Sequence, residues 1–295
     1  MKIGRFGLNL MKTLVVNQNI KRRKYAPPHI FKEFINIPYI EDGEVQHSYD
    51  VYLAKEENRK NCCVIDIHGG AFIFCEHQDN YPFGYVLLEQ GYDVMLVDYI
   101  PNDGNVDTIE LVKQTILNIK HFLNHLQDYG LENDRFVIAG DSAGGYLALL
   151  ISEAIMSKEV ASNIGIDCPE LDLVATILNC PVYDFEHIGD SLSKSGRHRM
   201  IGPRYNDLEW LKTISPKTYI KDFNKPIFLS TCKNDFIRSE SLKLYEDIKD
   251  RDNIEFLDIQ SDDKNVDHVY NVTKINLEES KQVNNAIGKF IEKYL

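Results

Sequence analysis

Residues 139–145 read AGDSAGG and place one serine among residues that have almost no side chain. Ser142 lies in the pattern Gly-x-Ser-x-Gly, after the apolar run RFVIAG and before an apolar helical pattern. In that context the pattern is typical of a strained strand-to-helix turn. Such a turn lifts a hydroxyl to the edge of a sheet at a helix N-terminus, where developing negative charge is favoured. The chemistry would be nucleophilic attack by Ser142, and a plain tight turn is the alternative.

A second group of small residues follows an earlier apolar run, CCVIDI, in the sequence HGGAF of residues 68–72. Two consecutive glycines let the backbone turn so that amide groups point into a shared space, which is where an oxyanion needs hydrogen-bond donors. A Gly-Gly turn whose His68 is satisfied locally is the alternative. The Ser142 turn later in the chain makes that alternative weaker, because a nucleophile there would need such donors.

A serine hydroxyl is a weak nucleophile, so a base must take its proton and a carboxylate should orient that base. Of the nine histidines, His268 stands apart, because it lies in a polar loop between the last strand pattern and the last helix pattern. Asp235 lies just beyond the seventh strand pattern and before a helix. Asp263 and Asp267 are rivals by their closeness to His268 in sequence, and a helix cap is the alternative role for Asp235.

Eight apolar runs with strand character must position these residues. They cover residues 33–40, 48–54, 62–67, 92–98, 134–139, 172–178, 226–231 and 254–259. Helical patterns cover residues 79–90, 106–127, 143–157, 239–250 and 279–294. The early strands follow one another closely and the later ones alternate with helices. The chain therefore predicts one α/β domain over residues 1–295. Its eight-stranded sheet is mostly parallel, antiparallel at its start, and covered by helices on both faces.

Two segments fit neither a strand nor a helix pattern well. They are the N-terminal segment and a polar, irregular insertion after the sixth strand. An insertion of this length is more typical of a functional cap than of a plain loop. We expect cap elements from about residues 1–32 and 183–221, and we expect Phe72, His77 and Tyr183 to line a substrate pocket.

Composition excludes some functions and leaves others open. Hydrophobic residues make up 43% of the 295 residues and charged ones 26%, which is ordinary for a globular protein with a sizeable core. The net charge of −12 makes nucleic-acid binding improbable. The six cysteines include no Cys-x-x-Cys pair and lie in or beside apolar runs, which predicts reduced thiols, no metal site and a cytoplasmic location.

The N-terminal stretch MKIGRFGLNLMKTLVVNQNIKRRKY mixes basic and apolar residues. Lys12 interrupts the apolar run and no small-residue cleavage site follows, which argues against a secretory signal. No stretch approaches the roughly 20 apolar residues that span a bilayer, so we expect no stable membrane insertion. An amphipathic helix that lies on the body of the protein is expected, and contact with a membrane surface is the alternative.

Together these pieces resemble the α/β-hydrolases of the hormone-sensitive-lipase-like esterase group. The matching segments are IHGGAF at 67–72, VDY at 97–99, GDSAGGYLA at 140–148, NDFIRSE at 234–240 and DH at 267–268. They occur in the family's order with similar separations. The resemblance implies a triad of Ser142, His268 and Asp235, a cap made from the two irregular segments, and no metal or organic cofactor.

The resemblance also assigns the oxyanion-hole amides to Gly69, Gly70 and Ala143. The chain departs from the family pattern at three places. Ala71 stands where the family has a third glycine, Ile-Pro-Asn follows at 100–102, and His-Val-Tyr stands at 268–270. These departures leave the triad intact but weaken any transfer of substrate preference.

The sequence thus predicts a serine carboxylesterase that cleaves small, uncharged, short-acyl esters through an acyl-enzyme. Amide hydrolysis, for instance of arylformamides, is a variant within the enzyme class. A hydrolase scaffold that binds a ligand without turnover is the alternative from another class, but such scaffolds generally lose a triad member. The expected partner is a small-molecule ester, and assembly into a homo-oligomer is left open.

Overall fold

The computed structural model describes residues 4–23, 26–188 and 193–295. Eight strands form one sheet in the order β1-β2-β4-β3-β5-β6-β7-β8. The strands are β1 Lys32–Pro38, β2 Ser48–Leu53, β3 Cys63–Ile67, β4 Asp93–Val97, β5 Arg135–Asp141, β6 Asp172–Asn179, β7 Ile227–Cys232 and β8 Ile254–Ile259. The β1–β2 and β2–β4 pairs are antiparallel and the others are parallel, which confirms the predicted mixed sheet.

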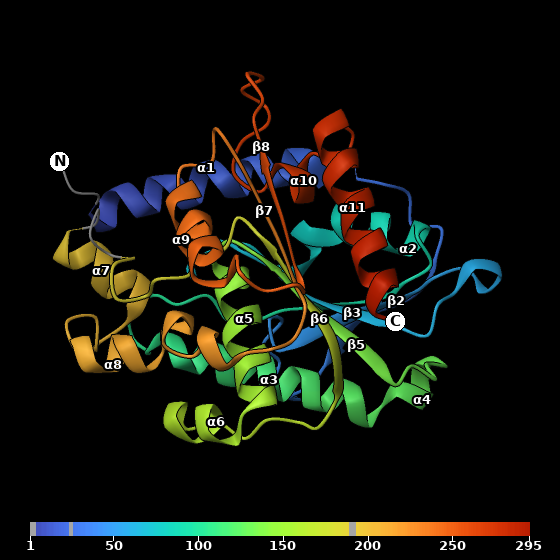
Figure 1. The fold of residues 1–295 in the computed structure, drawn as a ribbon. Helices are drawn as coiled ribbons and strands as arrows, with labels where there is room; N and C mark the ends of the chain where they lie inside the picture. Colours follow the sequence, from blue (N-terminus) through green and yellow to red (C-terminus); the bar gives the residue numbers. More distant parts are fainter. Residues whose placement is uncertain (1–3, 24–25, 189–192) are drawn as a thin grey trace.

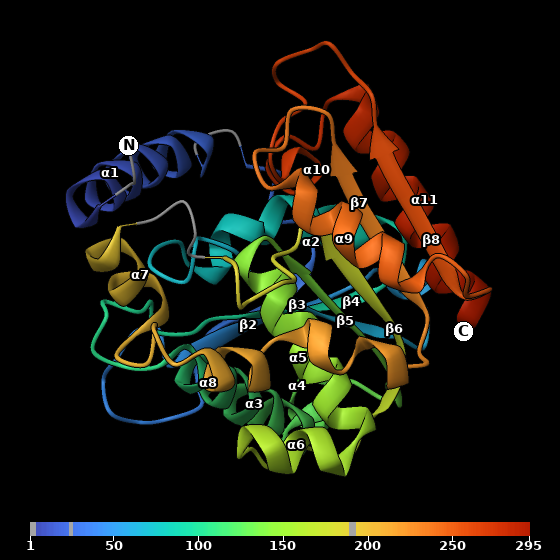
Figure 2. The same ribbon diagram turned by 60° about the vertical axis from the view of Figure 1, so that its left-hand side comes forward.

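Helices cover both faces of this sheet (Figure 1; Figure 2). The longer ones are α1 Arg5–Arg23, α2 Tyr81–Glu89, α3 Thr108–Asn124, α5 Ala143–Met156, α9 Arg238–Ile248 and α11 Glu278–Tyr294. The shorter ones are α4 Leu126–Tyr129, α6 Lys158–Ile164, α7 Lys194–Ile201, α8 Leu208–Thr213 and α10 Tyr270–Thr273. The buried side chains of α3, α5 and α9 belong to one core cluster, and those of α2 and α11 belong to the other.

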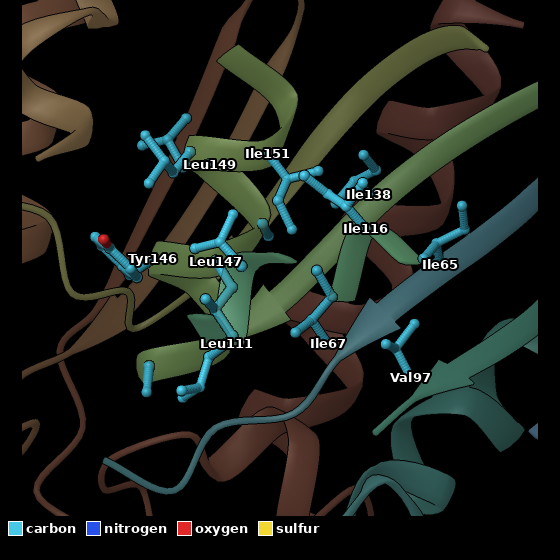
Figure 3. Packing of buried hydrophobic residues seen from close by; sticks show 14 of the residues in the cluster. Ile65, Ile67, Val97, Leu111, Ile116, Ile138, Tyr146, Leu147, Leu149 and Ile151 are labelled. Carbon is cyan, nitrogen blue, oxygen red and sulfur yellow. The ribbon is translucent and has the colours of Figure 1, made fainter. Parts of the chain in front are cut away.

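The central strands are apolar on both sides because both sides are covered. In β3, Ile65 and Ile67 face the cluster with α3 and α5, whereas Val64 faces the cluster with α2 and α11. Figure 3 shows Ile65 and Ile67 of β3 in one layer with Leu147 and Ile151 of α5. Each of these side chains is essentially fully buried. This two-sided burial explains the continuous apolar runs of the parallel strands and holds their carboxyl ends in fixed positions.

The two segments predicted as cap elements fold mainly into helices. Helix α1 lies outside the sheet, beside α7, and Arg199 of α7 donates a hydrogen bond to Asn9 of α1. The insertion forms α7, α8 and two short 3-10 turns at Pro216–Thr218 and Ile220–Asp222. Residues 1–3, 24–25 and 189–192 of these segments lie outside the described residues. That the two segments act as a cap stays a prediction.

Among the described helices, none combines the length and the apolar character needed to cross a bilayer.

Candidate active site

Three side chains from three loops meet at the carboxyl edge of the sheet. Ser142 lies between β5 and α5, Asp235 follows β7, and His268 lies between β8 and α10. The Nδ1 atom of His268 is 2.7 Å from Oδ1 of Asp235, and its Nε2 atom is 2.9 Å from Oγ of Ser142. A carboxylate that holds the proton on Nδ1 leaves Nε2 free to accept the hydroxyl proton. The structure therefore brings together the three residues that the sequence singled out.

The backbone at Ser142 explains the small residues around it. Ser142 has φ 54° and ψ −116°, a conformation that a non-glycine residue rarely adopts and that stores strain. A Cβ atom on Gly144 would lie 2.0 Å from the carbonyl oxygen of Ile67, so the first turn of α5 can approach β3 only with glycine at this position. The turn therefore presents the hydroxyl of Ser142 at the N-terminus of α5.

Asp235 is held as a charged hydrogen-bond acceptor. Its side chain is fully buried, and it accepts hydrogen bonds from the hydroxyl of Thr231 at 2.8 Å and from the amide of Ile237 at 3.0 Å. Burial alone would raise the pKa of Asp235, but the hydrogen bond and charge of His268, with these two donors, lower that pKa below its ordinary value. The carboxylate is therefore ready to orient the imidazole and to stabilise its protonated form.

The two rival carboxylates have other partners. Asp267 lies 2.6 Å from the ammonium group of Lys274, and Asp263 accepts hydrogen bonds from the amide and side chain of Asn265. In the described structure the imidazole of His268 is hydrogen-bonded to Asp235 and to neither of these two carboxylates. The structure favours Asp235 over both rivals.

The oxyanion assignment needs a correction at Gly69. Its amide donates a hydrogen bond to Oδ1 of Asp141 at 3.0 Å, so this N–H is occupied. Among the described residues, the amides of Gly70, Ala71 and Ala143 have no acceptor. Ala143 is the first residue of α5, where helical geometry leaves the amide without an intrahelical partner. The candidate donors are therefore Gly70, Ala71 and Ala143.

The loop that carries these donors has an unusual backbone. Gly70, Ala71 and Phe72 have φ values of 112°, 52° and 66°, three successive residues in the left-handed region. A Cβ atom on Gly70 would lie 1.9 Å from the carbonyl oxygen of Phe74, which explains the glycine. Strain of this kind persists only when surrounding contacts hold it, and it is common at functional sites.

A buried group of polar side chains holds this loop against the serine turn. The side-chain amide of Asn80 donates to Oδ2 of Asp66 and to Oδ1 of Asp141, both at 2.8 Å. Asp141 in turn accepts the amide of Gly69. Burial and the nearby Asp141 carboxylate raise the pKa of Asp66 to about 7, and burial also raises the pKa of Asp141. The oxyanion loop and the nucleophile turn are thus tied together by one carboxyl pair.

This carboxyl pair predicts a dependence of stability on pH. A carboxyl whose pKa is raised on folding binds its proton more tightly in the folded state, so its contribution to stability is lost as pH rises from the unfolded pKa through about 7. The Asp66→Asn variant removes this titration and keeps an acceptor for Asn80. We expect it to melt higher than the wild type by several degrees at pH 8, and by less at pH 5, in thermal unfolding followed by circular dichroism. Equal differences at both pH values would contradict the raised pKa of Asp66.

His77 does not line the substrate pocket, and this prediction was wrong. Its ring is buried between two carboxylates, with Nδ1 2.8 Å from Asp98 and Nε2 3.2 Å from Asp50. Burial would lower the pKa of His77, but the hydrogen bonds and charges of Asp50 and Asp98 raise it to about 10. Asp98 also accepts from His68, at 3.0 Å. His77 is therefore a charged structural residue below the oxyanion loop.

Phe72 and Tyr183 also lie away from the pocket. The ring of Phe72 packs edge-on against Tyr146 and Phe185, with centroids 5.4 and 5.8 Å apart, and is fully buried. The hydroxyl of Tyr183 donates to Asp247 at 2.6 Å. Tyr183 is also fully buried, and neither residue lines the cavity beside the triad.

A cavity of about 310 Å³ lies over the triad. Ser142 and His268 line it together with Met11 and Val15, two apolar residues of α1. Phe236 also lines the cavity, and its ring lies 4.4 Å from that of His268. The N-terminal segment thus contributes side chains to the pocket, in place of the three residues that the sequence suggested. None of the lining residues within the described chain comes from residues 183–221.

One group of metal-ligand side chains comes together in the described chain, and it includes two triad members. Ligand atoms of Cys180, Asp235 and His268 lie within 4.8 Å of one another. His268 and Asp235 are already hydrogen-bonded to each other, and burial followed by the nearby Asp235 charge raises the pKa of the Cys180 thiol well above its ordinary value. A protonated thiol is a poor ligand, so this donor set fits a hydrogen-bonded triad better than a metal site.

The sheet order, the serine turn after β5 and the acid and base after β7 and β8 together define an α/β-hydrolase. The BD-FAE family matches residues 49–246, which is more than half of the chain, and the chain belongs to this family. The α/β-hydrolase fold implied by the resemblance to hormone-sensitive-lipase-like esterases is also confirmed.

Solved structures of similar fold include two esterases. Esterase B from Lactobacillus rhamnosis, inhibited by a C4-C4 tributyrin phosphonate, has a TM-score of 0.85 and 20% sequence identity and covers 97% of this chain and 94% of its own. An esterase from the bacterial hormone-sensitive lipase family has a TM-score of 0.68 and 17% identity, with coverage of 94% and 89%. At these identities the likeness shows the fold.

Two curated relatives match part of the chain. One is "Probable isoprenylcysteine alpha-carbonyl methylesterase ICMEL1" of Arabidopsis thaliana, 22% identical over 66% of this chain and 41% of its own length. The other is "Probable carboxylic ester hydrolase LipM" of Mycobacterium tuberculosis, 25% identical over 68% of this chain and 47% of its own. The chain spans less than half the length of either relative.

Proposed function

We propose that the protein is a serine carboxylesterase, a hydrolase of carboxylic esters that works through an acyl-enzyme. The observation that carries this proposal is the continuous chain of hydrogen bonds from Ser142 through His268 to Asp235 beside a cavity. Family membership and the esterases among the relatives support the same reaction class. A scaffold without turnover has no need to keep this geometry or the strained backbone of Ser142.

In this mechanism Oγ of Ser142 attacks the ester carbonyl while Nε2 of His268 takes the hydroxyl proton. Asp235 stabilises the imidazolium that forms, and the imidazolium gives the proton to the leaving alcohol. The candidate amides of Gly70, Ala71 and Ala143 stabilise the tetrahedral oxyanion. Water activated by His268 then releases the acid from Ser142 and restores the enzyme.

The cavity supports a preference for small, short-acyl esters. Its volume of about 310 Å³ is at the lower end of the range for small-molecule sites, and Met11, Val15 and Phe236 give it apolar walls. Asp79, Asp141 and Asp267 also line the cavity, and no Lys or Arg of the described residues does, so a negatively charged acyl group would find no compensating cation. The proposed substrates are therefore neutral esters with a short acyl chain.

A series of p-nitrophenyl esters from acetate to long acyl chains tests this preference. We expect kcat/KM to be highest for acyl groups of about two to four carbons and to fall at least about tenfold for the longest chains, because they exceed the cavity. An arylformamide measured at matched concentration serves as the amide comparison. A maximum of kcat/KM at long acyl chains would contradict the substrate proposal. Faster turnover of the arylformamide than of the esters would show that amide hydrolysis is the preferred reaction.

The covalent intermediate can be detected separately from turnover. A phosphonate ester should add once per chain, and peptide mass spectrometry should locate the adduct on Ser142. Labelling at another residue, or no labelling of an active preparation, would contradict the acyl-enzyme mechanism.

A further inference from the structure

Helix α1 has apolar side chains on two opposite faces. On its inner face Leu8 is buried, and Met11 and Val15 line the cavity. On its outer face five apolar side chains are exposed: Phe6 (83%), Leu10 (54%), Leu14 (61%), Val16 (36%) and Ile20 (51%). A surface helix normally presents polar residues to solvent. Val16 and Ile20 also border a groove that residues 44–46 line, whereas Phe6, Leu10 and Leu14 are the most exposed of the five.

The spacing along α1 places these exposed residues together. Phe6, Leu10 and Leu14 repeat every four residues and form one row along the helix, and Val16 and Ile20 form a second row on the adjoining side, nearer the helix C-terminus. Figures 1 and 2 show α1 at the outside of the molecule. Several large apolar side chains gathered in this way mark an interaction site rather than chance exposure.

The charge of the same segment identifies the partner. Residues 1–25 contain seven Lys and Arg and no Asp or Glu, whereas the whole chain has a net charge of −12. Basic charge is thus concentrated in the segment that carries the outer face of α1. A partner that attracts both a basic segment and exposed Phe, Leu and Ile side chains must be anionic and apolar together. A nucleic acid would satisfy the charge alone.

We propose that the outer face of α1 docks the protein on an anionic lipid surface. A helix with large apolar side chains and basic residues lies in the interface of a bilayer, with its apolar side chains below the head groups and its cations beside the anionic ones. The inner face of α1 stays packed on the protein, so docking needs no unfolding. Such binding is reversible, since one short helix buries little area in the lipid.

Docking on this face would bring the cavity close to the lipid. Met11 and Val15 line the cavity from the helix that carries the docking face, and Phe236, 70% exposed, lines it from the loop after β7. An ester carried in the lipid surface would then have a short path into the cavity. This last step rests on the proposed esterase function, whereas the docking itself does not.

Cosedimentation with vesicles tests the docking on the full chain carrying Ser142→Ala, so that binding is measured without turnover. We expect binding to vesicles of equal parts phosphatidylcholine and phosphatidylglycerol, and at least about tenfold weaker binding to phosphatidylcholine alone. Added salt should weaken the binding, because it screens the basic segment. The Leu10→Ser/Leu14→Ser variant should bind at least about tenfold more weakly, because two exposed leucines that would enter the lipid are replaced by polar side chains.

The matched control is Leu117→Ser, which changes an exposed leucine of α3 on the far side of the molecule from α1. It should bind as the parent does. Circular dichroism of each variant, and hydrolysis of a small soluble ester by the same variants with Ser142 restored, show that folding and the cavity are intact. Leu10 and Leu14 do not line the cavity, so that hydrolysis should persist.

Two outcomes overturn the proposal. The first is the absence of binding to anionic vesicles, or equal binding by Leu10→Ser/Leu14→Ser and its parent. The second is a dimer in sedimentation velocity that this variant dissociates, without vesicle binding, which would assign the outer face of α1 to a second copy of the chain. Neither outcome bears on ester hydrolysis, which is measured separately.

Discussion

The Ser142→Ala variant is expected to hydrolyse p-nitrophenyl acetate at least about 10⁵ times more slowly than the wild type while keeping its fold. The hydroxyl of Ser142 is the atom group that His268 activates, at 2.9 Å, and the described structure offers no second hydroxyl in hydrogen-bond contact with this imidazole. Without it no acyl-enzyme forms. Only the slow attack of water, helped by the oxyanion amides, would remain. The measurement is kcat at saturating ester. If a preparation of the variant takes up no phosphonate label, no contaminating serine esterase contributes to its residual rate.

Ser152→Ala is the matched control for this substitution. Ser152 lies in the same helix, α5, is fully buried, and accepts a hydrogen bond from Thr176 at 3.0 Å. Its loss should cost some stability but leave kcat within about threefold of the wild type. If Ser142→Ala retained wild-type activity, or if Ser152→Ala lost as much, the hydroxyl of Ser142 would not be the nucleophile.

The strands could be predicted because their signal is local. Short apolar runs between turn residues predicted all eight strands to within two residues of their observed ends. The place of β4 between β2 and β3 could not be predicted, because it depends on which edges pair across the chain. The predicted helix at 106–127 proved to be two helices, interrupted where His125 leaves helical geometry, and periodicity over one turn does not reveal such a break.

The triad geometry was predictable for a different reason. A nucleophile turn needs small neighbours, so the Ser142 turn is visible in seven residues. Asp235 and His268 could be selected because loops at the carboxyl ends of parallel strands converge at one edge. Chain order and position after the strands were enough to predict that these two residues act together. In the structure their side chains are 2.7 Å apart.

The oxyanion and pocket residues depend on contacts that no local pattern carries. The amide of Gly69 donates its hydrogen bond to Asp141, a residue of another strand. The sequence HGGAF alone therefore could not show which of its amides remain available to an oxyanion. The donor that the sequence did not suggest is the amide of Ala71. Its one available signal was the small side chain of this residue, at the place of the family's third glycine. His77 is drawn away from the pocket by Asp50 and Asp98, two carboxylates distant in sequence.

The Asp235→Asn variant is expected to lose about 10³- to 10⁴-fold in kcat with little change in KM. The side chain of Asp235 does not line the cavity, so ground-state binding of the ester should persist. The neutral amide cannot stabilise the imidazolium that forms as Ser142 attacks. If its NH₂ group faces Nδ1 of His268, the imidazole proton is also forced onto Nε2, which then cannot accept from Ser142.

Asp263→Asn is the matched control, because Asp263 is an exposed acid of the same loop as His268, and within the described chain its carboxylate accepts hydrogen bonds from Asn265 alone. It should keep kcat within about threefold of the wild type.

Asp267→Asn tests whether the neighbouring carboxylate orients the base instead. If it lost more kcat than Asp235→Asn, the carboxylate beside Lys274 would be the one that orients the base. A large rise in KM with unchanged kcat for Asp235→Asn would likewise remove Asp235 from the triad, because a residue that acts through the imidazole must change the chemical step.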